Sequence, residues 1–146
     1  MDPALAFQLL NGVVLPWWTL WLVAPRSRGS RLAASHAAVF VVLAAAYALL
    51  LVAALTSADA GGGFDFDALR AALGTPIGFL AGWTHFVVFD LFVGAWIVRE
   101  SNRLALEPRA YLLLALLAGP IGLGGFLVRR ALHLRSWGQI GEVDLA

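Results

Sequence analysis

The chain has 146 residues, of which 61% are hydrophobic and only 13% are charged, and its formal net charge is +1. A soluble domain of this size averages about 45–50% apolar and about 25% charged residues, so a soluble enzyme, a nucleic-acid-binding module and a disordered chain all fit poorly. The absence of cysteine excludes disulfides, thiolate catalysis, Fe–S clusters and cysteine-based zinc sites.

Four apolar stretches are each long enough to cross a membrane as a helix, which takes about 20 residues. They cover residues 3–23, 33–56, 76–98 and 110–128. The first has no positively charged segment before it and is followed closely by Pro25, so we expect a retained helix and not a cleaved signal peptide. The pattern predicts an all-α membrane protein, a four-transmembrane-helix bundle that forms one integral membrane domain over residues 1–146.

A glycine-rich link separates the second and third stretches. After it, residues 64–73 place Phe66, Leu69 and Leu73 on one side of a short helix, with Asp67 as its N-cap. Such a segment is typical of a short interfacial helix that lies along the membrane surface. A plain loop is the alternative interpretation.

The fourth stretch contains a break in its backbone hydrogen bonding. Pro120 has no N–H to donate to the carbonyl of Leu116, and Pro16 has the same effect on Gly12 in the first stretch. A freed carbonyl at membrane depth needs another partner, so the two prolines predict a kink or a cavity. Small residues near the second break favour close helix packing, namely Ala115, Gly119 and Gly122.

The arginines give a weak indication of membrane orientation. With four crossings and the N-terminus outside, six of the ten arginines fall in the two cytoplasmic loops and four on the other side. Both termini are therefore expected outside. Because all ten basic residues are arginine and alanine is abundant, we expect a GC-rich coding sequence and a location in a bacterial inner membrane.

Ionisable side chains inside a span indicate function by default. The third stretch has two of them, His85 and Asp90. Their separation of five residues places them about 140° apart around a helix, so each must find partners on other helices or in an internal cavity. For Asn11 and Gln8, ordinary hydrogen bonds between helices are an equally good explanation.

Residue counts from a shared membrane face predict two polar layers inside the bundle. One layer contains Asn11, Tyr47 and His85. The other contains Asp90 at the level of Trp17, Trp18 and the broken backbone at Pro120.

Several other chemistries find no support in the sequence. Three histidines are too few for the histidine-rich di-iron site of membrane desaturases, and no histidine pair at i, i+4 and no Glu-x-x-His occurs. There is no phosphate-binding loop, no dinucleotide-binding fingerprint and no Gly-x-Ser-x-Gly. We therefore predict no cofactor, assign no metal ligand and leave the need for a metal open.

The third stretch carries a long motif over residues 83–96, WTHFVVFDLFVGAW. This motif resembles the signature of the abscisic-acid-deficient-four family, small membrane proteins named for a plant plastid protein required to make neoxanthin from violaxanthin. Shorter segments resemble the family as well, namely Asn11, Pro16-Trp17, Ala24-Pro25-Arg26 and residues 119–123, GPIGL. The resemblance extends over essentially the whole chain.

The resemblance implies an isomerisation of a carotenoid or another apolar polyene or isoprenoid. An epoxide opens, a proton leaves a nearby carbon and an allene forms, which requires an acid and a base but no redox cofactor. The implied catalytic pair is His85, which shuttles a proton, and Asp90, which burial keeps protonated as the acid. The implied substrate-binding residues are Asn11, Trp17, Trp18, Tyr47, Trp83, Phe86, Phe89, Trp96 and Pro120. For the tryptophans and phenylalanines, a place in the aromatic belt at the membrane interface or against lipid is an equally good explanation.

Two other functions are consistent with the same residues. A non-catalytic protein that binds a pigment or lipid, or that acts as a scaffold, would need the apolar walls but no proton transfer. A small proton-coupled transporter would need Asp90 and a broken helix. The expected partners are a carotenoid or another apolar polyene or isoprenoid and the lipid bilayer, with no nucleic acid. Assembly as a homo-oligomer is left open.

Overall fold

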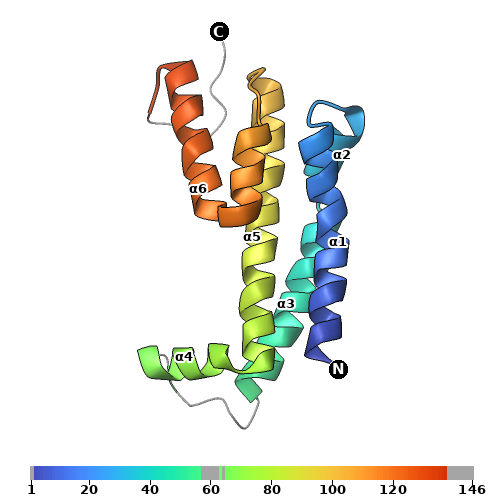
Figure 1. Cartoon of the computed structure of the whole chain (residues 1–146), viewed down its shortest axis with the longest axis vertical. Helices are drawn as coiled ribbons and strands as arrows, with labels where there is room; N and C mark the ends of the chain where they lie inside the picture. Colours follow the sequence, from blue (N-terminus) through green and yellow to red (C-terminus); the bar gives the residue numbers. More distant parts are fainter. Residues whose placement is uncertain (1, 57–62, 64, 138–146) are drawn as a thin grey trace.

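The computed structural model describes residues 2–56, 63 and 65–137. All regular structure in this part of the chain is helical: α1 (Pro3–Val23), α2 (Arg28–Ser35), α3 (Ala38–Thr56), α4 (Phe66–Gly74), α5 (Pro76–Arg103) and α6 (Arg109–Leu134) (Figure 1). Four of these helices are long and apolar enough to cross a membrane, namely α1, α3, α5 and α6. The predicted all-α membrane fold with four long apolar helices is confirmed.

Helix starts are fixed by side chains that accept hydrogen bonds from the first free backbone N–H groups. Asp2 caps α1, Ser27 caps α2 and Thr75 caps α5. The short helix α4 is present where the sequence predicts it, but its N-cap is Asp65. The prediction of Asp67 as the cap was wrong, because Asp67 already lies in the first helical turn.

Three helix boundaries differ from those predicted, and one of them is the end of the fourth helix, which lies at Leu134 and not at residue 128. The second stretch is not one helix from residue 33, because residues 28–35 form the separate helix α2 and α3 begins at Ala38. The third helix continues to Arg103, so Arg99 and Glu100 lie on α5 and not in a loop. All three differences lie in polar segments, where a helix can end early or continue beyond the apolar stretch.

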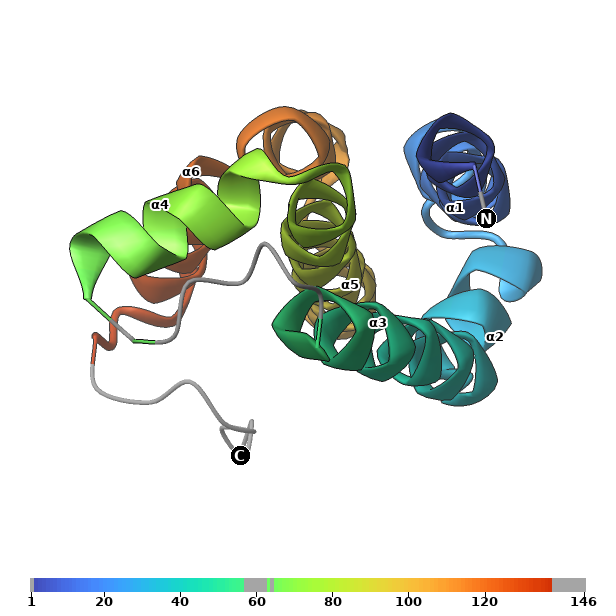
Figure 2. The same ribbon diagram turned by 90° about the horizontal axis from the view of Figure 1, so that it is seen from below.

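The long helix α5 is the centre of the arrangement. Helices α1, α2, α3, α4 and α6 all contact it, whereas α1 and α3 pack mainly against α5 and not against each other (Figure 2). Around its upper half the core is made of completely buried residues such as Trp21, Leu91, Ala95 and Phe126. Many other apolar side chains stay exposed on the outer surface, as expected for helices that face lipid.

Helix α6 does not run straight. Ala118 has non-helical backbone angles (φ −157°, ψ 70°), and the chain reverses there, so the residues before and after it form a helical hairpin (Figure 1). The two halves touch closely: a Cβ at Gly122 would lie 2.2 Å from the backbone nitrogen of Ala115. Further along the pair, the rings of Tyr111 and Phe126 meet at 5.6 Å. The break predicted at Pro120 is therefore a full reversal of direction.

A buried ion cluster fixes the far end of this hairpin to α5. Arg130 donates to the carboxylate of Glu100 at 2.5 Å, and Arg103 donates to both oxygens of the same carboxylate at 2.7 and 2.8 Å. The side chains of Arg130 and Glu100 are only 3% and 10% exposed. The C-terminal end of α6 therefore lies beside the C-terminal end of α5, the helix that precedes it in the chain.

Candidate functional site

A cleft of about 430 Å³ lies at the tip of the α6 hairpin, and α1 and α5 form its other walls. We call it the Asp90 cleft. Apolar wall residues come from α1, from Val87 of α5 and from residues 116–119 at the hairpin tip. Eight residues predicted for the site also line it: Asn11, Trp18, Trp83, His85, Phe86, Phe89, Asp90 and Pro120.

Asp90 lies against the hairpin tip. A Cβ added at Gly119 would be 1.8 Å from the Oδ1 atom of Asp90, so the carboxyl group approaches the backbone at a point that only glycine leaves open. The side chain is half-buried. The predicted level of Asp90 beside Pro120 agrees with this position, and the contact places an ionisable group where the helix reverses.

His85 occupies a different position, at the rim of the cleft. Its side chain is exposed on α5, with the ring of Phe89 at 4.7 Å and the ring of Tyr47 on α3 at 5.5 Å. The structure therefore places His85 and Tyr47 together, as the predicted first polar layer requires. His85 does not lie in the interior of the bundle, so the prediction that both His85 and Asp90 are interior was wrong for His85.

Three of the predicted binding residues lie outside the walls of the cleft. Tyr47 contacts it only through His85, Trp17 packs against Trp21 at 6.3 Å, and Trp96 packs edge-on against Phe126 at 5.4 Å. The rings of Tyr47 and Trp96 contribute to packing between helices, whereas the Trp17 ring packs against a residue of its own helix.

Asn11 lines the cleft, but its amide does not join two helices. The side-chain nitrogen donates to the carbonyl of Phe7 at 2.8 Å, one turn earlier on α1. Gln8 is exposed. The alternative interpretation for these two residues was hydrogen bonding between helices. The side chain of Asn11 makes its hydrogen bond within α1 instead.

Trp83 brings an unused donor to the cleft wall. Its indole nitrogen is buried and has no hydrogen-bond partner. The ring packs against Phe7 at 5.2 Å and Phe79 at 6.2 Å. A buried indole N–H normally finds an acceptor, so Trp83 carries an unsatisfied donor on a residue that lines the cleft.

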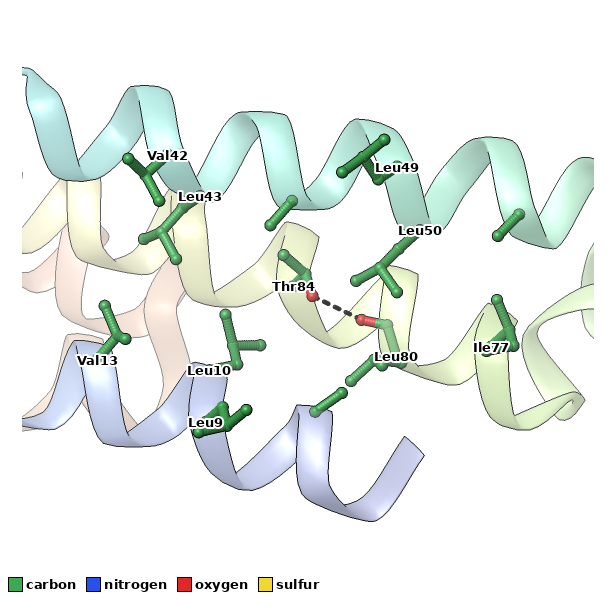
Figure 3. Close-up of a pocket in the computed structure, with 13 residues that line it drawn as sticks. Leu9, Leu10, Val13, Val42, Leu43, Leu49, Leu50, Ile77, Leu80 and Thr84 are labelled. Atoms are coloured by element: carbon green, nitrogen blue, oxygen red, sulfur yellow. Dashed lines mark hydrogen bonds between the residues drawn. The ribbon is translucent and has the colours of Figure 1, made fainter. Parts of the chain in front are cut away.

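A second groove, of about 540 Å³, lies on the other side of the contact between α1 and α5 (Figure 3). We call it the aliphatic groove, because aliphatic side chains from α1, α3 and α5 make up its walls apart from Thr84. The hydroxyl of Thr84 donates to the carbonyl of Leu80 on its own helix at 2.8 Å. This groove suits a hydrocarbon chain and offers no group for acid–base chemistry.

Across the part of the chain that the structure describes, no three histidine, aspartate or glutamate side chains come together in a way that could hold a metal ion. The ionisable groups at the Asp90 cleft are one carboxyl and one imidazole. Their chemistry is proton transfer.

The comparison with protein families agrees with the motif on α5. Residues 5–126 match the family model described as ABA DEFICIENT 4-like. The chain belongs to this family. It is 23% identical over 133 residues to "Protein ABA DEFICIENT 4, chloroplastic" of Arabidopsis thaliana, an alignment that covers 86% of this chain and 60% of that protein. No solved structure matches.

The chain thus spans about three fifths of the length of its Arabidopsis relative. Membrane residence agrees with the four long apolar helices. The relative is named as chloroplastic, so the comparison gives no support to the expected bacterial inner membrane.

In this ABA DEFICIENT 4-like chain, sequence reasoning missed two features of the site. Gly119 was interpreted as a small residue for close helix packing, but it accommodates the carboxyl of Asp90. Ala118, where the direction reverses, carries no signal of its own. The neighbouring Pro120 indicates a break, and only the contacts of the folded chain decide how far the helix turns.

The contact between Gly119 and Asp90 leads to a testable prediction. We expect Gly119→Ala to lower the free energy of unfolding by about 1–3 kcal/mol, because the new methyl group overlaps Oδ1 and displaces the carboxyl. In an Asp90→Ala background the same substitution is expected to cost much less. A double-mutant cycle on protein purified in detergent measures this coupling.

Gly12→Ala is the matched control, since nothing lies within 4 Å of a Cβ at that position. If Gly119→Ala costs the same with and without the carboxyl of Asp90, the contact does not determine the need for glycine.

Proposed function

We propose that this ABA DEFICIENT 4-like protein is a membrane enzyme that modifies a carotenoid or another long apolar polyene by acid–base chemistry, as an isomerase. The observation that carries the proposal is the position of Asp90: a carboxyl group held against the reversed backbone of α6, in a cleft with aromatic walls. Support also comes from the resemblance of the α5 motif to proteins required for neoxanthin formation.

The cleft provides the kind of surroundings that such a substrate needs. A polyene dissolves in the bilayer and would enter from the lipid, where Phe86 and Phe89 are exposed at the rim. Aromatic and aliphatic walls bind an apolar ligand, and a few polar groups fix its orientation. The indole N–H of Trp83 is the proposed donor to a ligand oxygen.

In the proposed reaction Asp90 in its neutral form donates a proton to the epoxide oxygen as the C–O bond breaks. His85 accepts the proton that leaves the neighbouring carbon, and the electron pair of that C–H bond forms the new double bond of the allene. His85 then releases its proton and Asp90 takes one up, so both groups return to their starting forms. The sum is an isomerisation, and no oxidant or reductant is consumed. Because His85 lies at the rim and Asp90 deeper in the cleft, the two groups would act on different atoms of one substrate end group.

The test is expression of the full chain in a bacterial host that accumulates epoxy-carotenoids, followed by chromatography and mass measurement of the pigments. We expect a new product of unchanged mass. Asp90→Asn and His85→Ala are each expected to reduce its formation by about 10²–10⁴-fold, the contribution typical of a general acid or base. Matched controls are Asp67→Asn and His133→Ala, which change the same residue types at exposed positions outside the cleft.

Product formation that survives both substitutions would contradict the assigned roles. A pigment that co-purifies unchanged with the protein would instead support a second function, non-catalytic binding. The aliphatic groove favours that function, because it has room for a hydrocarbon chain and no ionisable group. Uptake of a solute that depends on a proton gradient would favour a transporter.

A further inference from the structure

The first half of α6, before the reversal at Ala118, is too short to cross a membrane. Residues 109–117, before the reversal, form about 14 Å of helix at 1.5 Å per residue. The hydrocarbon core of a bilayer is about 30 Å thick. The first half of α6 therefore reaches only about half-way across, and the chain then turns back.

Both ends of α6 are attached to the same end of the molecule. Arg109, at its start, donates to the carbonyls of Leu22 and Val23 at the end of α1. Arg130, near its other end, contacts Glu100 near the end of α5. A single straight crossing would separate these two arginines by the thickness of the membrane.

Because α6 turns back, its C-terminal arginines lie at the same end of the molecule as the arginines of α2 and α5. Arg26 pairs with Glu107 in the loop between α5 and α6, and Arg99 donates to the carbonyl of Ala34 at the end of α2. Only Arg70, on α4, lies at the opposite end. Nine of the ten arginines therefore share one end. Arg130 is buried there against Glu100, and we call the other eight the arginine face: Arg26, Arg28, Arg31, Arg99, Arg103, Arg109, Arg129 and Arg135.

Charge differs strongly between the two ends. Among the described residues, the arginine face carries two acidic side chains, Glu100 and Glu107. The opposite end carries Asp2, Asp65 and Asp67 with Arg70. Loops rich in arginine stay on the cytoplasmic side of a membrane, where anionic headgroups are concentrated.

We infer that α6 is a re-entrant hairpin that enters and leaves the membrane on one side, and that the arginine face contacts the anionic headgroups of the cytoplasmic leaflet. The two ends of the described chain then lie on opposite sides of the membrane, with residue 2 outside and residue 137 in the cytoplasm. The non-helical backbone at Ala118 is tolerated at mid-membrane depth because it lines the Asp90 cleft. The hairpin tip lines this cleft together with residues of α5 in the segment 83–90.

The natural absence of cysteine provides a direct test. Three single-cysteine variants of the full chain, Ser35→Cys, Asp67→Cys and Trp137→Cys, are expressed in the inner membrane of a bacterial host and treated with a membrane-impermeant maleimide. All three positions are exposed. We expect Asp67→Cys to be labelled in intact spheroplasts, and Ser35→Cys and Trp137→Cys only after the membrane is permeabilised.

Labelling of Trp137→Cys together with Asp67→Cys in intact spheroplasts would overturn the re-entrant hairpin. Labelling of Ser35→Cys there would overturn the assignment of the arginine face to the cytoplasm. Replacement of Arg26, Arg28, Arg31, Arg129 and Arg135 by glutamine is expected to give a mixed population in which the labelling of Asp67→Cys falls by about half. Unchanged labelling would show that the arginines do not set the orientation.

Discussion

Gly122→Ala is expected to destabilise the protein by about 3 kcal/mol or to prevent it from folding, because the new methyl group meets backbone that cannot move aside. A Cβ at this position would lie 2.2 Å from the nitrogen and 2.5 Å from the Cα of Ala115, in the other half of the α6 hairpin. Small residues allow such close approach of two helices in a membrane. Unfolding by denaturant in detergent micelles measures the loss.

The control for this prediction is Gly124→Ala, two residues further along the same helix. Nothing lies within 4 Å of a Cβ at Gly124. That variant is expected to be neutral or slightly stabilising, because alanine favours helix more than glycine does. Equal stability of the two variants would mean that the halves of α6 do not pack as closely as the structure places them.

Glu100→Ala is expected to cost about 3–5 kcal/mol, since it removes one partner of a buried ion pair and leaves the charge of Arg130 buried. The Arg130 side chain is only 3% exposed and cannot reach water without movement of α6. The free energy of unfolding of the purified variant, compared with the unchanged protein under the same conditions, measures the loss.

Two further variants show whether burial is the cause. Arg26→Ala breaks the ion pair with Glu107, in which both side chains are more than half exposed, and we expect a loss below about 0.5 kcal/mol. Glu100→Leu combined with Arg130→Met removes both buried charges and is expected to recover much of the stability that Glu100→Ala loses. Equal losses for Glu100→Ala and Arg26→Ala would contradict this explanation.

The sequence predicted the four long helices and the short one between the second and third, because apolar stretches are local signals. Helix α2 was missed because its start depends on a contact with the preceding segment. Ser27 accepts from the backbone N–H of Ser30, whose hydroxyl donates to the carbonyl of Ala24 at 2.6 Å. That contact exists only once α1 and α2 are placed. The reversal at Ala118 was missed for the same reason, since Pro120 shows that the helix breaks but not in which direction the chain continues.

The sequence predicted the level of the site residues along the helices better than it predicted which side of a helix each one faces. Counting along each helix correctly placed Asp90 near Pro120 and His85 near Tyr47. It did not show that His85 lies at the rim and Asp90 against Gly119. In a soluble protein the apolar side of a helix marks the interior, but lipid is as apolar as a helix interface, so composition does not tell which side of α5 faces the bundle.

The position of α5 has a consequence for both grooves. Trp83 and Asp90 line the Asp90 cleft, whereas Leu80 and Thr84, which lie within one turn of Trp83, line the aliphatic groove. A lipid or detergent tail that displaces α5 from one side therefore changes the width available on the other. Where an occupant of one groove changes affinity in the other, thermodynamic linkage requires the reverse effect to be of the same size. A detergent tail bound in either groove would then act as an effector of the protein and not merely as its solvent.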